Sequence, residues 1–197
     1  MARTDVSMTS EFYHCYPLSR MDGRDERDIR AFEPVDPRGM GLVAYLQRQA
    51  LSDELRGTMR TYLVRDNLTD ELVGYFSLKA GLVSVNESGD AGGIEFDTVP
   101  GVELANFAVD GRFRRAHPEA RGCCKAIFSD LVLPVVGQAA EVVGVAVLYI
   151  FSLPEERVMS NYEGYGFHRL GEEAERSLHS RLKLRYDQQC VFMYMML

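Results

Sequence analysis

The sequence predicts an α/β (α+β) layered domain, in which a mixed central sheet of six to seven strands is flanked by about four helices. Two observations lead to this fold class. Apolar runs of strand length, such as residues 144–151, alternate with a run that places apolar residues at helical spacing, residues 42–55. Turn residues separate these runs. The chain has 197 residues, 46% of them hydrophobic and 26% charged, which suits one domain of ordinary size. We therefore expect a loose N-terminus over residues 1–10 and a single domain over 11–197.

The first half of the chain supplies a strand, helices and a hairpin. A first strand is expected within residues 11–18, and the charged run 20–30 reads as a solvated turn or short helix. Residues 42–55 follow as one amphipathic helix. The turn residues 66–70 join strands at 61–64 and 72–85 into a hairpin. The glycine-rich, polar residues 86–100 then predict a mobile loop.

The second half continues the alternation. We expect strands at 103–109, 144–151, 167–170 and 190–197, a helix from about residue 122, and a short helix over 154–162. Pro134 predicts a kink or an early end of the first of these helices, because proline lacks the N–H that the helix needs. Residues 171–188 are charged and carry no clear pattern.

A cluster of cations stands at the start of the helix near residue 122. Residues 111–125 contain one acid, Glu119, and five basic residues. The basic residues are Arg112, Arg114, Arg115, Arg121 and Lys125. A helix N-terminus offers unpaired N–H groups and a partial positive charge, so a cationic loop that opens a helix suits a phosphate or pyrophosphate. A basic surface loop without a ligand is the alternative.

Composition excludes several classes of protein. The formal net charge of −7 disfavours nucleic acid as a partner, because nucleic-acid-binding proteins usually present a broad basic face. No apolar run approaches the ~20 residues of a membrane span, and the first fifteen residues lack a signal-peptide pattern, so we expect no membrane and a cytoplasmic location. The four cysteines have no metal-ligand spacing and no metal is expected; Cys124 at the helix start remains open as a nucleophile.

Two motifs resemble the GNAT acetyltransferase superfamily. The triplet Phe107-Ala108-Val109 and the loop Glu119-Ala120-Arg121-Gly122-Cys123-Cys124 are similar to its cofactor strand and its pyrophosphate loop, whose pattern is [QR]-x-x-G-x-[GA]. The loop keeps the middle glycine, but Glu119 and Cys124 depart from the pattern. The second match, residues 161–167, resembles the ending Tyr-x-x-x-Gly-Phe. The resemblance covers about residues 60–170 and implies a GNAT fold that uses acetyl-CoA as acyl donor.

The resemblance also implies roles for single residues. Phe107, Ala108 and Val109 would pair with the pantetheine arm. The pyrophosphate would take Arg121, Gly122, Cys123, Cys124 and Lys125, and Arg114 and Arg115 could reach the 3′-phosphate. Tyr162 matches the tyrosine that protonates the departing thiolate; a core tyrosine is the alternative. Glu103 resembles the general base of one branch of the family; a structural salt bridge is the alternative.

The leading function is therefore an acetyl-CoA-dependent N-acetyltransferase that acts on a primary amine of a small molecule or peptide by direct attack. Two alternatives stay open. One is a GNAT-fold module that binds CoA, or nothing, and regulates or interacts without catalysis. The other is a toxin-like GNAT that acetylates aminoacyl-tRNA, which residues 60–85 resemble but which the net charge disfavours. A homodimer is also open, and the acceptor amine is not identified.

Overall fold

A computed structural model describes residues 6–85, 96–181 and 189–197. The chain divides into two compact units. Unit 1 comprises Met1–Lys79 and Leu104–Gln138, and unit 2 comprises Ala80–Glu103 and Ala139–Leu197. The single domain expected over 11–197 stays a prediction.

Within the described residues, eight strands form a mixed sheet in the order β1-β2-β3-β4-β5-β6-β8-β7, so the strand count exceeds the six to seven expected. The pairs β1–β2, β2–β3, β3–β4, β6–β8 and β7–β8 are antiparallel, and the pair β5–β6 is parallel. The strands are β1 (Met8–Thr9), β2 (Tyr13–Pro17), β3 (Arg60–Asp66), β4 (Leu72–Val85), β5 (Phe96–Val109), β6 (Val147–Ser152), β7 (His168–Arg169) and β8 (Val191–Met196).

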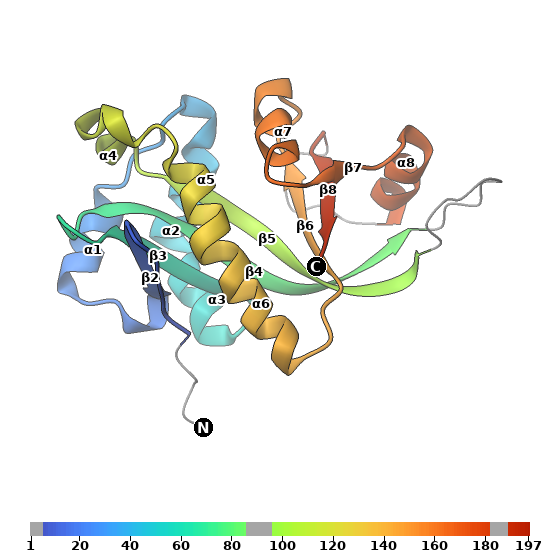
Figure 1. Ribbon diagram of the computed structural model, residues 1–197, viewed down its shortest axis with the longest axis horizontal. Helices are drawn as coiled ribbons and strands as arrows, with labels where there is room; N and C mark the ends of the chain where they lie inside the picture. Colours follow the sequence, from blue (N-terminus) through green and yellow to red (C-terminus); the bar gives the residue numbers. More distant parts are fainter. Residues whose placement is uncertain (1–5, 86–95, 182–188) are drawn as a thin grey trace. The chain divides into compact units, whose positions relative to one another are not determined.

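Unit 1 carries helices on both faces of its strands. Figure 1 shows α5 and α6 crossing one face of β3 and β4, with α2 and α3 behind the other. These helices are α1 (Gly23–Arg30), α2 (Met40–Arg48), α3 (Ala50–Arg56), α4 (Gly111–Ala116), α5 (Cys123–Ile127) and α6 (Leu133–Val142), with 3-10 turns at Leu18–Arg20, Pro37–Gly39 and Pro118–Ala120. One hydrophobic core joins Leu46 and Ala50 to Leu63 and Tyr75.

A buried ionic network closes the α1 side of unit 1. The Arg65 guanidinium, 3% exposed, pairs with Asp25 and donates from Nη2 to Asp28 Oδ2 at 2.8 Å. Arg65 Nε donates to the Tyr16 hydroxyl at 2.7 Å, and that hydroxyl donates to Asp25 Oδ1 at 2.6 Å. Because every charge in this network has a partner, the cost of burying Arg65 is offset.

The helix after Gly122 does not end at Pro134. It runs from Cys123 to Val142 without a break, and its turn at Phe128–Val132 is π-helical, with the Leu133 N–H bonded to the Phe128 carbonyl five residues back. The wider turn makes room for the ring of Pro134, which would clash with a carbonyl in a regular α-helix. The early end that we predicted is therefore wrong.

This helix also bears on the expectation that no apolar segment of the chain approaches the length of a membrane span. Its 20 residues are long and apolar enough, by length and composition alone, to cross a membrane. Ile127, Phe128, Leu131 and Val132 are buried inside the protein, and 39% of the apolar window of this helix is buried.

Unit 2 contains two helices, which pack with the strands that follow residue 139. They are α7 (Glu156–Glu163) and α8 (Glu172–Arg181). Ala174 and Leu178 of α8 pack against Val147 and Tyr149 of β6 and Phe192 of β8. The rings of Tyr149 and Phe192 stack with their centroids 5.6 Å apart, so aromatic side chains form much of this core.

Three elements differ from the sequence-based expectation. Residues 42–55 form two helices rather than one, because Gln49, at φ −120°, breaks the helical backbone between α2 and α3. The basic loop after Val109 contains α4, whose start is capped by the Asp110 side chain. Part of the unassigned run 171–188 forms α8. Residues 86–95 of the mobile loop predicted over 86–100 lie outside the described residues, and residues 96–100 form the start of β5 instead of a loop.

Candidate functional site

Two of the basic residues near α5 are held by acids of unit 1. Arg112 Nη2 donates to Asp110 Oδ2 at 2.7 Å, and the hydrogen bonds of that pair hold the pKa of Arg112 above its usual range. Arg115 forms an ion pair with Glu33, which lies 82 positions earlier in the chain. These two guanidinium groups therefore stabilise the fold around α4.

Arg114 points into the loop that precedes α5. Its Nη1 donates to the carbonyl of Arg121 at 3.0 Å, to that of Ala120 at 3.3 Å and to Cys123 Sγ at 3.4 Å. The hydrogen bond with Cys124, followed by the charge of Arg114, lowers the pKa of the Cys123 thiol below its usual range, against the opposing effect of burial. Arg114 thus holds the loop from within, and its predicted contact with a 3′-phosphate stays untested.

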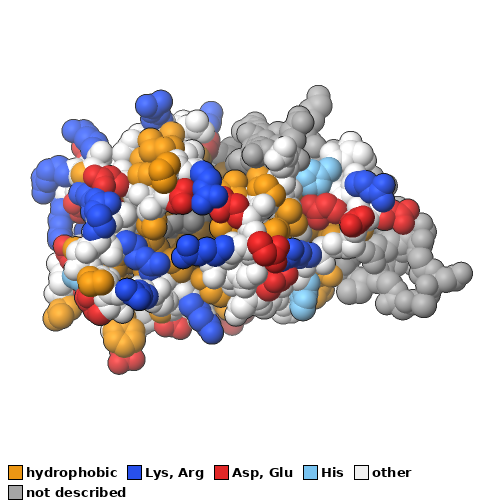
Figure 2. Space-filling model, turned by 90° about the horizontal axis from the view of Figure 1, so that it is seen from above, with side chains coloured by type: hydrophobic (Ala, Val, Ile, Leu, Met, Phe, Trp, Pro, Cys, Tyr) orange, Lys and Arg blue, Asp and Glu red, His pale blue; other side chains and the backbone are white. Residues whose placement is uncertain are grey.

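The remaining residues of the predicted pyrophosphate loop are open. Gly122 caps α5, and a Cβ atom built on it would meet nothing within 4 Å. Arg121 and Lys125 are exposed and, within the described parts of the chain, make no side-chain hydrogen bond or ion pair. Figure 2 shows several Lys and Arg side chains, interspersed with Asp and Glu, on the face that it presents. An open glycine between free cations at a helix start can accept an anion.

The strand that leads into this loop lies against the neighbouring backbone of β4. A Cβ atom on Gly74 would collide with the Ala108 carbonyl oxygen, so only glycine allows this approach. Phe107 and Ala108 are half-buried, Val109 is buried, and the Asp110 N–H donates to the Val73 carbonyl at 2.8 Å.

In unit 2, Glu103 is buried against a tyrosine. It lies opposite Tyr149 in the parallel pairing of β5 with β6, and the Tyr149 hydroxyl donates to Glu103 Oε2 at 3.4 Å. Glu103 is 4% exposed. A Cβ atom on Gly81 would overlap the Tyr149 hydroxyl, so this glycine leaves the space that the tyrosine occupies. The sequence did not single out Tyr149, because nothing in its spacing distinguishes it from the rest of an apolar strand.

Tyr162 ends α7 in a turn that its own carbonyl organises. That carbonyl accepts hydrogen bonds from the N–H groups of Tyr165 at 3.0 Å and Phe167 at 3.0 Å. Gly166 has φ +101°, a conformation that favours glycine, and Phe167 is 2% exposed. The Gly-Phe of the motif therefore fixes the turn, while the ring of Tyr162 is half-buried against Tyr165 and Phe167.

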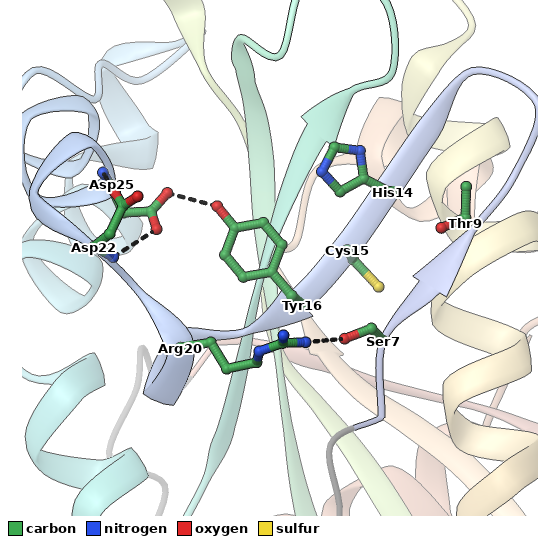
Figure 3. A pocket seen from close by; sticks show the side chains of 8 residues that line it. All are labelled: Ser7, Thr9, His14, Cys15, Tyr16, Arg20, Asp22 and Asp25. Carbon is green, nitrogen blue, oxygen red and sulfur yellow. Dashed lines mark hydrogen bonds between the residues drawn. The ribbon is translucent and has the colours of Figure 1, made fainter.

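Two features of unit 1 were missed at the sequence level. The imidazole of His117 lies between two acids, with Nε2 2.7 Å from Glu71 Oε2 and Nδ1 3.0 Å from Glu119 Oε1. Glu119, which does not match the family's loop pattern, therefore holds the loop rather than a ligand. A cavity of about 320 Å³ also opens beside β2. Figure 3 shows Tyr16 in it, with the hydroxyl turned toward Asp25. Its lining contains none of the predicted site residues; it consists of Ser7, Thr9, His14, Cys15, Tyr16, Arg20, Asp22 and Asp25.

The described residues contain no group of three or more metal-ligating side chains. No model of a known protein family matches the chain. Solved structures do match. A variant of the toxin AtaT bound to the C-terminus of the antitoxin AtaR and acetyl-CoA is 16% identical, with a TM-score of 0.62, over 91% of each chain.

Two further structures extend the comparison. AtaT complexed with acetyl-methionyl-tRNAfMet is 18% identical, with a TM-score of 0.64, over 91% of this chain and 93% of that one. The KacTA–DNA complex is 21% identical, with a TM-score of 0.56, over 84% of each chain. AtaT and KacT have the GNAT fold, so the fold expected from the two motifs is confirmed. The expectation that nucleic acid is a disfavoured partner finds no support among these neighbours.

Proposed function

We propose that this GNAT-fold chain is an acetyl-CoA-dependent N-acetyltransferase whose acceptor is the amine of an aminoacyl group carried by tRNA. The observation that carries the proposal is the loop before α5. There an open Gly122 stands between Arg121 and Lys125, which have no partner among the described side chains, at the start of a 20-residue helix. Backbone N–H groups and two cations at that position suit the pyrophosphate of CoA.

The other residues receive roles by the same proposal. Bound acetyl-CoA supplies an activated acetyl thioester. The backbone of Phe107, Ala108 and Val109 pairs with the pantetheine arm, and Cys123 and Cys124 add N–H groups to the loop. Tyr162 donates its phenolic proton to the departing thiolate, and Glu103 takes the proton that the amine loses, directly or through water. Arg114 supports the loop that binds the pyrophosphate.

Two observations favour an aminoacyl-tRNA over a free small amine. The neighbour AtaT has been captured with acetyl-methionyl-tRNAfMet. In addition, the face that Figure 2 shows carries several exposed Lys and Arg side chains in spite of the protein's net charge of −7. Because a phosphate backbone is bound mainly through such side chains, a local group of them can serve tRNA in an acidic protein.

The binding half of the proposal is tested by calorimetry with acetyl-CoA. Gly122→Val places a branched side chain where the pyrophosphate should approach the backbone, and we expect the dissociation constant to rise at least about tenfold. Gly137→Val is the matched control, because Gly137 also lies at an exposed position with nothing within 4 Å of a Cβ atom. Equal affinities in the two folded variants would place the pyrophosphate elsewhere.

The acceptor is tested with acetyl-CoA labelled in the acetyl group. We expect label to enter aminoacylated tRNA and not deacylated tRNA, peptides or free amines. Label in peptides or small amines alone would favour the broader N-acetyltransferase. Acetyl-CoA binding without transfer to any acceptor would favour a CoA-binding regulatory module.

The comparison with AtaT also suggests a physiological consequence. AtaT is a toxin that binds an antitoxin. If this chain acts in the same way, its expression alone should arrest bacterial growth and the Tyr162→Phe variant should not. Growth arrest by both proteins at equal expression would separate toxicity from acetyl transfer.

A further inference from the structure

Two hydrogen-bond donors of unit 1 meet at one sulfur atom. The Tyr45 hydroxyl of α2 donates to Met59 Sδ at 2.9 Å, and Asn106 Nδ2 of β5 donates to the same atom at 3.7 Å. A thioether is a weak acceptor, so both donors hold a poor partner. Neither contact was expected from the sequence, in which Tyr45, Met59 and Asn106 are far apart.

The phenol of Tyr45 is held in this orientation. Burial raises the pKa of the Tyr45 phenol, against the opposing effect of the Thr61 and Ser77 side chains, so the phenol stays protonated. Those two hydroxyls lie 2.9 Å from each other. The protonated Tyr45 hydroxyl donates to Met59 Sδ.

Asn106 is harder to explain as a packing residue. It is 6% exposed, yet within the described residues its side chain makes no hydrogen bond besides the one to Met59. A buried amide that lacks good partners destabilises a protein relative to an apolar side chain of similar size. A core alone would be served better by leucine at this position.

We infer that Tyr45 and Asn106 form a subsite for a carbonyl oxygen of the acceptor, and that Met59 occupies it until the acceptor arrives. An O–H and an N–H that converge on one point match the two lone pairs of a carbonyl oxygen. Met59 is half-buried, unbranched and flexible, so its sulfur can withdraw at little cost.

The position on the strand assigns the subsite to the acceptor. This step rests on the proposed function. Asn106 directly precedes Phe107, where the strand segment assigned to the acyl donor begins. A carbonyl held beside that segment belongs to a compound with a carbonyl group next to its amine, which is an α-aminoacyl ester or amide. A plain alkylamine has no atom for this subsite.

The test compares leucinamide with isopentylamine, which has the same carbon branch and amine without the carboxamide. Dissociation constants are measured by ligand-observed NMR on protein saturated with CoA and on protein alone. We expect the wild-type protein to bind leucinamide about tenfold more tightly, which corresponds to two modest neutral hydrogen bonds. In Asn106→Leu and in Tyr45→Phe this preference should be largely lost, so that the two compounds bind with nearly equal affinity.

Control variants test the subsite separately from the proposed function. Met59→Leu removes the competing sulfur, and we expect it to keep or increase the preference, whereas Met40→Leu at an exposed methionine should leave it unchanged. If Asn106→Leu does not fold, Tyr45→Phe decides alone, because it removes one oxygen atom. A wild-type protein that does not prefer leucinamide, or variants that keep the full preference, would overturn the inference. Failure of the proposed function would appear separately, as the absence of a thermal shift with acetyl-CoA.

Discussion

The two units of the chain differ most in charge. The sequence ranges of unit 1 contain 16 Lys and Arg and 16 Asp and Glu, whereas those of unit 2 contain 6 and 13. The whole net charge of −7 therefore belongs to unit 2, and unit 1 is balanced. The net charge therefore disfavours nucleic acid as a partner of unit 2 alone. Net charge is informative about a partner only when it is taken over the surface that the partner would contact.

The units also differ in how they bury polar groups. Unit 1 buries a fully charged network around Arg65, in which each guanidinium contact is to an acid, a hydroxyl or a carbonyl. In the core of unit 2, the Tyr149 hydroxyl donates to the Glu103 carboxylate, and the Tyr149 ring stacks on that of Phe192. The proposed roles follow the same division, because unit 1 carries the anion-binding loop and unit 2 carries Tyr162.

The largest effect should come from the proposed acid of unit 2. Tyr162→Phe keeps the ring and its contacts with Tyr165 and Phe167 and removes only the phenolic proton. Positioned acid catalysis is worth ~10²–10⁴-fold, so kcat should fall by about that factor while acetyl-CoA affinity stays the same. Steady-state kinetics and calorimetry measure the two quantities. A variant that loses stability but keeps kcat would make Tyr162 a structural residue.

The second effect tests the buried network of unit 1. Arg65→Met leaves Asp25 buried without its cation, and we expect the free energy of unfolding to fall by about 3–5 kcal/mol. Arg169→Met is the matched change in unit 2, where the pair with Glu156 and Glu163 is partly exposed, so we expect a much smaller loss there. Urea denaturation measures both variants. Equal losses would mean that the two units do not differ in this respect.

The third effect concerns the salt dependence of tRNA binding. Arg27 of α1 and Arg48 of α2 are exposed and, within the described residues, make no side-chain hydrogen bond or ion pair. If unit 1 contacts the phosphate backbone through them, the double variant Arg27→Ala and Arg48→Ala should reduce the slope of log affinity against log salt by about 2. Arg157→Ala in acidic unit 2 is the control. A larger change in the control would move the nucleic-acid surface to unit 2.

Local sequence signals predicted the bounds of an element well where turn residues mark both of its ends. The bounds of β4 agree with the predicted 72–85, because turn residues delimit an uninterrupted run there. The break at Gln49 has no glycine or proline to mark it. The start of α4 did have a signal, since Asp110 is a good N-cap, but Gly111 after it favoured a loop. The continuation of the helix past Pro134 depends on a π-turn that no residue pattern announces.

Motifs identified candidate residues of the site but not their partners. The pattern around Gly122 and Tyr162 could be found because a helix start and a Gly-Phe turn have fixed spacing. The ion pair of Arg115 with Glu33 spans 82 positions, and the contact of Tyr149 with Glu103 spans 46. Such contacts are set by the register of strands and the packing of helices, so spacing along the chain cannot predict them.

The smallest effect should come from His117, which fastens the loop of unit 1 to Glu71. Its hydrogen bonds to Glu71 and Glu119 raise its pKa above the ordinary value of 6.5. A group whose pKa is raised in the folded state stabilises the protein below its unfolded pKa, and this contribution is lost as pH rises through the folded value. The stability difference between wild type and His117→Gln should therefore be larger at about pH 6 than at about pH 9, where the imidazole is neutral. The contacts are near the surface, so we expect a difference of only about 0.2–1 kcal/mol in urea denaturation. A difference that grows with pH would mean that His117 acts as a neutral ring, and that packing on Phe113, whose ring centroid lies 4.4 Å away, holds the loop instead.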